Sequence, residues 1–104
     1  MPCFTLTAKA KADMLDIGRY TLSRWGREQR DKYLTMLDDC FQQLAADPLK
    51  GKDCSDIRNG YRKYRAGSHV IFYRQRLNNT IEIVRILHPR MDIENRLPGS
   101  EESS

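Results

Sequence analysis

The chain has 104 residues, which is enough for one domain with a single hydrophobic core and too few for two. Apolar residues make up 39% of it and charged residues 31%, which excludes the composition of a disordered chain. The net charge is +4, and between residues 58 and 90 the only acid is Glu82. Such a positive field favours an acidic partner, which would be nucleic acid, an anionic protein or an anionic membrane. A solvated, charged face of a sheet explains the same charges.

Membrane insertion and metal binding are both disfavoured by the sequence. The first 20 residues hold several charges and no apolar run of signal-peptide length, and the run Val70–Tyr73 is too short to span a bilayer. Cys3, Cys40 and Cys54 are odd in number and widely spaced, and with the two histidines they show no metal-ligand spacing. We therefore expect a cytoplasmic protein with free thiols, no cofactor, no metal and no membrane contact.

The first half of the chain predicts a short strand followed by a helical hairpin. Phe4–Thr7 alternates like a strand, and Thr7 is a suitable N-cap for a helix that ends at Gly26. A second helix ends before the Asp-Pro pair at 47–48, since the residue before proline leaves the helical region. The buried faces are expected to consist of Ala10, Met14, Ile17 and Thr21 in the first helix, and Tyr33, Leu37, Cys40, Phe41 and Leu44 in the second.

The second half predicts turns and then strands. Residues 48–60 are turn-like, strands are expected over 61–65, 70–74 and 80–87, and Asn78-Asn79 marks a hairpin. In the last strand, strict alternation places Ile81, Ile83, Arg85 and Leu87 on one face and Glu82, Val84, Ile86 and His88 on the other. Because both faces are apolar, this strand should lie inside the sheet.

The expected architecture is an α+β domain over residues 1–97, followed by a flexible tail over 98–104. A short N-terminal strand leads into a helical hairpin packed on a three- to four-stranded antiparallel sheet. A short helical turn over 92–97, with Asp92 as its N-cap, should end the domain.

The end of the last strand is the first candidate contact surface. A histidine titrates near neutral pH, an arginine offers a planar fork to carboxylates or phosphates, and a methionine is an adaptable apolar contact. Purely structural roles are open as well. Asp92 could cap a helix and pair with Arg96 at i+4, Met91 could be a core residue, and His88 could be a hydrogen-bonded histidine at the strand end. The residues of this surface are His88, Arg90, Met91, Asp92 and Arg96.

Basic and aromatic side chains elsewhere form a second candidate set. Arg58, Arg62, Lys63 and Arg65, interleaved with tyrosines, would suit RNA or an acidic protein, or would form a charged outer face. Large aromatic residues dominate binding hot spots, although a lone tryptophan beside a helix turn is more often a core residue. Tyr20 and Trp25 are the aromatic residues in question.

Several stretches in order resemble the ParE branch of the RelE/ParE toxin superfamily. They include the helix segment 12–21, Arg24-Trp25-Gly26, the segment 67–74 (Gly-Ser-His-Val-Ile-Phe-Tyr-Arg) and the strand end 83–92. Smaller matches are Gln29, Tyr33, Leu44-Ala45, Pro48, Ile57-Arg58, Gly60 and Arg62. The resemblance covers roughly residues 3–97, nearly the whole chain.

The resemblance implies a toxin of a bacterial toxin–antitoxin pair that is not an enzyme. Toxins similar to ParE act on DNA gyrase, trap its cleaved-DNA complex and block replication. A ParD-like antitoxin folds over the toxin, and the complex binds promoter DNA only through the antitoxin. The free toxin would form a homodimer through the helical hairpin, and Leu15 and Leu22 are a weak indication of such a dimer. Gyrase contacts are expected at the strand-end surface, and antitoxin contacts at Tyr20, Trp25, Arg58, Arg62, Arg65, Arg74 and Arg85.

Two other functions remain open at this point. A RelE-like, ribosome-dependent mRNA endonuclease on the same fold would need an acid, a base and cations for the phosphorane. Lys63, Arg65, Arg85 and His88 are the residues for those roles, but Asp92 and Glu94 stand where such a site would need cations. A structural or transcription-linked module is the third interpretation.

Overall fold

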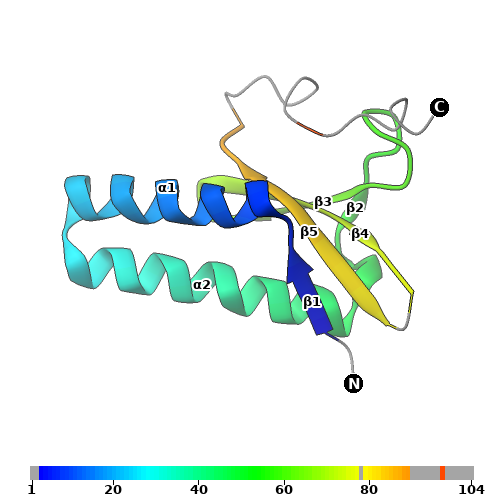
Figure 1. Ribbon diagram of the computed structural model, residues 1–104, viewed down its shortest axis with the longest axis horizontal. Helices are drawn as coiled ribbons and strands as arrows, with labels where there is room; N and C mark the ends of the chain where they lie inside the picture. Colours follow the sequence, from blue (N-terminus) through cyan, green and yellow to red (C-terminus); the bar gives the residue numbers. More distant parts are fainter. Residues whose placement is uncertain (1–2, 78, 90–96, 98–104) are drawn as a thin grey trace.

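The computed structural model describes residues 3–77, 79–89 and 97, and shows two helices lying on one face of a sheet (Figure 1). The helical hairpin and the α+β class match the prediction. The elements in chain order are β1 (Cys3–Leu6), α1 (Ala8–Trp25), α2 (Arg27–Ala46), the 3-10 helix η1 (Pro48–Lys50), β2 (Lys52–Asp53), β3 (Arg62–Ala66), β4 (His69–Gln75) and β5 (Thr80–Leu87).

The helical hairpin begins and turns at the predicted residues. The Thr7 side chain accepts a hydrogen bond from the Ala10 N–H at 3.0 Å and so caps α1. Gly26, with φ 92°, is the single residue between the two helices. Its N–H donates to the Leu22 carbonyl and its carbonyl accepts from the Arg30 N–H, both at 3.0 Å, so one glycine ends one helix and starts the next.

The sheet has five strands in the order β1-β5-β4-β3-β2. Its topology differs from the predicted three- to four-stranded antiparallel sheet in two ways. β1 runs parallel to β5, which is possible because two helices and three strands separate them in the sequence and no tight turn joins them. The turn-like segment contributes the two-residue strand β2. β5 is an interior strand, as expected.

Both hairpin turns of the sheet use residues that tolerate positive φ. Ala66 pairs with His69, which leaves Gly67 and Ser68 as a two-residue turn, and Gly67 has φ 59°. Glycine with positive φ at the first of two turn positions is typical of a type II′ hairpin. In the β4–β5 turn, Asn79 also has φ 59°, as the asparagine pair predicted.

The strand β5 carries a β-bulge that the sequence did not reveal. Phe72 of β4 pairs with Arg85, whereas Tyr73 pairs with Ile83, so Val84 is an extra residue. An extra residue reverses the alternation of side chains beyond it. The predicted faces of β5 were therefore wrong after the bulge: Ile81, Ile83 and Ile86 belong to the core beneath the helices, and Val84 and Leu87 belong to the cluster on the opposite face.

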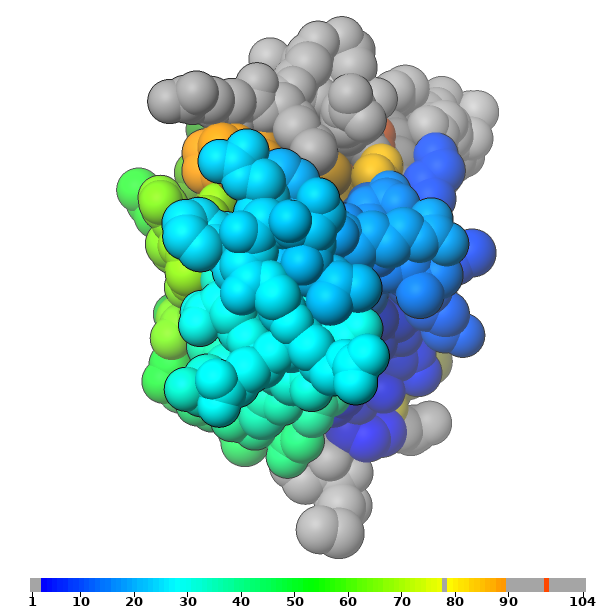
Figure 2. Space-filling model, turned by 90° about the vertical axis from the view of Figure 1, so that its left-hand side faces the viewer, coloured from blue at the N-terminus to red at the C-terminus, as the bar shows by residue number. Residues whose placement is uncertain are grey.

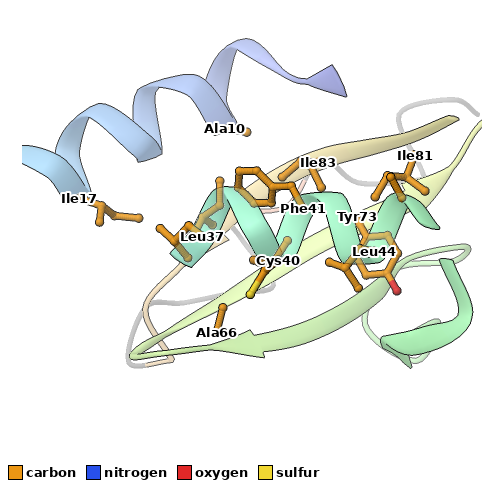
Figure 3. Packing of buried hydrophobic residues seen from close by; sticks show 13 residues of the cluster. Ala10, Ile17, Leu37, Cys40, Phe41, Leu44, Ala66, Tyr73, Ile81 and Ile83 are labelled. Carbon is orange, nitrogen blue, oxygen red and sulfur yellow. The ribbon is translucent and has the colours of Figure 1, made fainter. Parts of the chain in front are cut away.

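The main core lies between the helical hairpin and the sheet (Figure 3). The predicted helix stripes are confirmed, with Leu37 and Leu44 fully buried and Phe41 1% exposed. Met14 and Tyr33 are the exceptions, since both are half-buried, and the Tyr33 hydroxyl enters a polar cluster described below. Asp13 and Gly18 of α1 are buried as well, which apolar periodicity did not predict.

A second, smaller apolar cluster covers the other face of the sheet. The segment between β2 and β3, which was predicted only as turns, supplies part of this cover. The cluster consists of Cys54, Tyr61, Phe72, Val84, Leu87 and Leu97, with Ile57 and Val70 packed against it. The predicted helical turn over 92–97 and the tail over 98–104 lie outside the described residues, except for Leu97.

Within the described residues, neither helix has the length and apolar character needed to cross a membrane.

Candidate functional site

The predicted gyrase-contact surface begins at His88, directly after β5. His88 is half-buried, and its ring meets the ring of His69 edge to face, with centroids 5.8 Å apart and an interplanar angle of 89°. The other members of this surface, Arg90, Met91, Asp92 and Arg96, lie outside the described residues. What the structure adds is therefore the base of this surface, a histidine pair at the ends of two neighbouring strands.

The first residue of β4, His69, is tied to the second helix through a tyrosine. The Tyr33 hydroxyl lies 2.7 Å from His69 Nδ1, and it accepts a hydrogen bond from the Ser68 N–H at 2.9 Å. Its other acceptor, the Ala66 carbonyl, is 3.5 Å away. The short distance to His69 favours a Tyr33 proton donated to Nδ1, which requires a neutral imidazole with its own proton on Nε2.

The electrostatic surroundings also disfavour the charged form of His69. Burial lowers the pKa of His69 below its usual 6.5, and His88 nearby lowers it further, while Asp13 acts in the opposite direction. Sequence reasoning did not single out His69, because its partners come from α2 and from the end of β5. Only the fold brings them together.

A buried ion pair joins α1 to the end of β5. Asp13 accepts from Arg85 Nη2 at 2.7 Å and from Arg85 Nε at 2.8 Å, and its Oδ2 also accepts the Ile86 N–H at 2.9 Å. The parallel pairing of β1 reaches only Ile83, after which Thr7 closes the edge by donating its N–H to the Ile83 carbonyl. Asp13 therefore supplies the acceptor that a neighbouring strand would otherwise provide.

The same ion pair changes the interpretation of Arg85 as an antitoxin contact. The Arg85 side chain is 13% exposed and that of Asp13 is 11% exposed. Hydrogen bonding to Asp13 raises the pKa of Arg85, although burial opposes the shift. Arg85 is thus part of the internal structure, and its availability to a partner is small.

The remaining predicted antitoxin arginines are spread over the β2–β3 segment, β3 and β4. Arg58 and Arg62 donate to the backbone carbonyls of their own region, at 2.8 and 3.0 Å. Arg74 pairs with Glu82 at 2.8 Å and lies 5.5 Å from the centre of the Tyr61 ring. Arg65 is exposed and donates to the Gly67 carbonyl. These arginines do not converge on one pocket.

Most of the large apolar side chains that are exposed among the described residues belong to α1. Trp25 is 67% exposed and Tyr20 is 59% exposed, so the interpretation of Trp25 as a core residue is wrong. Leu15 and Leu22, two helical turns apart, are 61% and 41% exposed. Trp25 ends α1 at the closed end of the hairpin, which extends beyond the sheet in Figure 1 and faces the viewer in Figure 2. Leu15, Leu22 and Trp25 lie toward one side of α1, whereas Tyr20 lies on another side, because a helix has 3.6 residues per turn. We refer to Leu15, Leu22 and Trp25 as the α1 apolar surface.

Among the described residues, no group of three or more His, Cys, Asp or Glu side chains is placed to hold a metal ion.

The comparisons with known proteins agree on one family. The family model described as the ParE toxin of the type II toxin–antitoxin system parDE matches residues 4–93. Toxin ParE1 of Mycobacterium tuberculosis is 43% identical over 94 residues, which are 90% of this chain and 96% of the relative. Toxin ParE1 of Caulobacter vibrioides is 38% identical over 97 residues, covering 93% of this chain and 99% of the relative.

A further relative supports the same assignment, and a solved structure shares the fold. Toxin ParE of Escherichia coli is 37% identical over 97 residues, covering 93% of this chain and 94% of the relative. A structure titled chromosomal ParDE TA system from P. aeruginosa superposes with a TM-score of 0.73 at 21% identity, over 85% of this chain and 96% of that one, and shows the shared fold. The chain therefore belongs to the ParE toxin family of type II toxin–antitoxin systems.

Proposed function

We propose that this toxin inhibits DNA gyrase by trapping its cleaved-DNA complex, and thereby blocks replication in the bacterial cytoplasm. The observation that carries the proposal is similarity to ParE toxins over nine-tenths of the chain, including the strand end at His88. In this proposal the toxin is a binding protein, and His88, Arg90, Met91, Asp92 and Arg96 contact gyrase. The rigid interior strand β5 holds the start of that surface.

The geometry gives little support to the alternative of an mRNA endonuclease. That chemistry needs free cations near a proton donor and acceptor. Arg85, one of the cations considered, is bound by Asp13, and Lys63 is paired in register with Phe72, whose side chain belongs to the cluster on the far face of the sheet. The titratable pair near the strand end, His69 and Tyr33, is instead engaged in holding β4 against α2.

A ParD-like antitoxin is the proposed partner, and the α1 apolar surface is its proposed docking site. Soluble proteins seldom leave several large apolar side chains together on one helix unless a partner covers them. Of the arginines expected to contact the antitoxin, Arg58, Arg62 and Arg74 remain candidates for charged contacts outside the α1 apolar surface, because they lie between β2 and β3, in β3 and in β4. A homodimer of the free toxin would use the same helix and would compete with the antitoxin.

Expression of the toxin in a bacterial host distinguishes gyrase inhibition from mRNA cleavage by whether DNA synthesis or protein synthesis stops first. A gyrase inhibitor should stop incorporation of labelled thymidine first and leave incorporation of labelled methionine running. If protein synthesis stops first and DNA synthesis continues, the gyrase proposal is wrong. Co-expression of the protein encoded by the neighbouring reading frame should restore growth if it is the antitoxin.

A further inference from the structure

A basic surface lies on the sheet face turned away from the helices. Lys63 of β3 pairs with Phe72, and Arg65 pairs with Val70. Both partners belong to the apolar cluster on that face, and directly paired residues share a face. Lys52 of β2 pairs with Lys63 and extends the same row. We refer to Lys52, Lys63 and Arg65 as the far-face basic surface.

The pairing within this surface is unfavourable for the isolated chain. Lys52 and Lys63 stand directly opposite each other on neighbouring strands, and like charges in that position destabilise a sheet. The ion pairs found among the described residues involve Arg19, Arg30, Arg74 and Arg85, and none of the three surface residues. A bound anion would offset the repulsion between the two lysines.

The shape and chemistry of the surface favour one kind of anion. The aromatic residues of this face, Tyr61 and Phe72, are 3% and 0% exposed, so no ring is available to stack on the bases of single-stranded nucleic acid. An acidic protein partner would be expected to bury apolar side chains in the interface, and most of the exposed apolar side chains that could receive them are on α1 instead. Along β3, Lys63 and Arg65 are two residues apart, a rise of about 6.7 Å, which is similar to the separation of successive phosphates on a DNA strand.

We infer that the far-face basic surface binds the sugar–phosphate backbone of duplex DNA without reading its sequence. The inference goes beyond the proposed function, because it concerns the toxin chain alone and needs no gyrase. If the proposed function and this inference are both correct, the α1 apolar surface and the far-face basic surface bind different partners. Contact with the DNA backbone would then increase the affinity of the toxin for a target that is bound to DNA.

A charge reversal at Lys52 tests the inference without weakening the fold. Lys52→Glu replaces the like-charge pair with an opposite-charge pair to Lys63, so the urea midpoint should rise slightly while DNA binding falls. The probe is a short fluorescent DNA duplex titrated with the full chain at several KCl concentrations. We expect the dissociation constant to rise roughly tenfold at about 0.1 M salt, and the slope of log K against log salt to lose about one unit. Arg65→Gln should reduce the slope in the same way.

Lys9→Glu on α1 is the matched control, since Lys9 is exposed and the net charge changes equally. It should bind the duplex nearly as the unaltered chain does. Equal loss in both charge reversals would overturn the inference, because attraction would then depend on net charge alone. Tighter binding to single-stranded DNA or to polyglutamate than to the duplex would also overturn it, and so would a failure to bind the duplex at low salt. The assay contains no gyrase, so its failure leaves the proposed function standing.

Discussion

Asp13 and Arg85, 72 positions apart in the sequence, are joined by two hydrogen bonds of 2.7 and 2.8 Å that connect the first helix to the end of the last strand. The same carboxylate accepts the Ile86 N–H, so one side chain both neutralises a buried guanidinium and completes the hydrogen bonding of a strand edge. The pair thereby fixes the position from which β5 runs into His88 and the proposed gyrase-contact surface.

Loss of the Asp13 carboxylate should be strongly destabilising. Asp13→Ala removes the carboxylate that binds the buried Arg85 charge and that accepts the Ile86 N–H. Breaking one side of a buried ion pair costs about 3–5 kcal/mol, and urea denaturation would measure it. Asp16→Ala is the matched control, because Asp16 is on the same helix, is 75% exposed and lies 3.9 Å from Arg19. If both variants lose the same free energy of unfolding, the buried pair contributes no more to stability than an exposed carboxylate does.

The stability of the protein should depend on pH through His69. The unfolded chain binds a proton at His69 near pH 6.5, whereas burial lowers the folded-state pKa. Between the two pKa values the unfolded state holds more protons, so this contribution is fully present above the unfolded pKa and is lost as the pH falls through the window below it. Urea denaturation between about pH 5 and 8 should show this fall, and His69→Gln should reduce it. The same slope in both proteins would contradict the assignment to His69.

The sequence predicted those elements whose determinants are local. The Thr7 cap, the break at Gly26 and the strand Thr80–Leu87 each depend on residue types within a few positions, and all three are confirmed. The parallel pairing of β1 and the bulge at Val84 depend on contacts between distant segments, which periodicity does not report. For the same reason the sequence missed Asp13, which stands on an apolar helix face and gains its partners only in the folded sheet.

The candidate site shows the same division. His88 could be chosen from the sequence because it ends an apolar strand, but its neighbour His69 and the bond to Tyr33 could not. The sequence did not distinguish Arg85 from the other basic residues of the strands. Its burial follows from the ion pair with Asp13, which only the folded structure shows.

Two glycines should respond to alanine in opposite directions. A Cβ on Gly51 would overlap the Tyr73 hydroxyl, which donates to the Pro48 carbonyl and accepts the Gly51 N–H, and it would lie 2.9 Å from the Lys63 carbonyl. Gly51→Ala should therefore cost about 1–3 kcal/mol of unfolding free energy.

Gly18 is the counterpart, because it lies inside α1 and its Cβ would meet the Leu34 side chain at an ordinary 3.4 Å. Gly18→Ala should gain about 0.5–1 kcal/mol, since alanine loses less backbone freedom in a helix. Thermal unfolding of both variants measures the two changes in stability. If Gly51→Ala unfolds at the same temperature as the unaltered protein, the Tyr73 side chain can move to make room for the added methyl group.

The α1 apolar surface predicts a binding hot spot for the antitoxin. Trp25→Ala should leave the unfolding free energy nearly unchanged, because the ring is 67% exposed, but should weaken antitoxin binding by about 2 kcal/mol. Calorimetric titration of the toxin with the antitoxin measures this loss. Leu49→Ala, at a residue that is 66% exposed in η1, serves as the control and should bind normally. If the two variants bind equally well, the antitoxin docks elsewhere.

The most direct test of the central claim is a cleavage assay with purified toxin, DNA gyrase, ATP and supercoiled plasmid. After removal of protein, linear and nicked plasmid should accumulate with rising toxin concentration, and Arg90→Ala should give much less of both while keeping the unfolding curve of the unaltered toxin. If the plasmid stays intact at every toxin concentration while mRNA is cut on translating ribosomes, the toxin is an endonuclease and not a gyrase inhibitor.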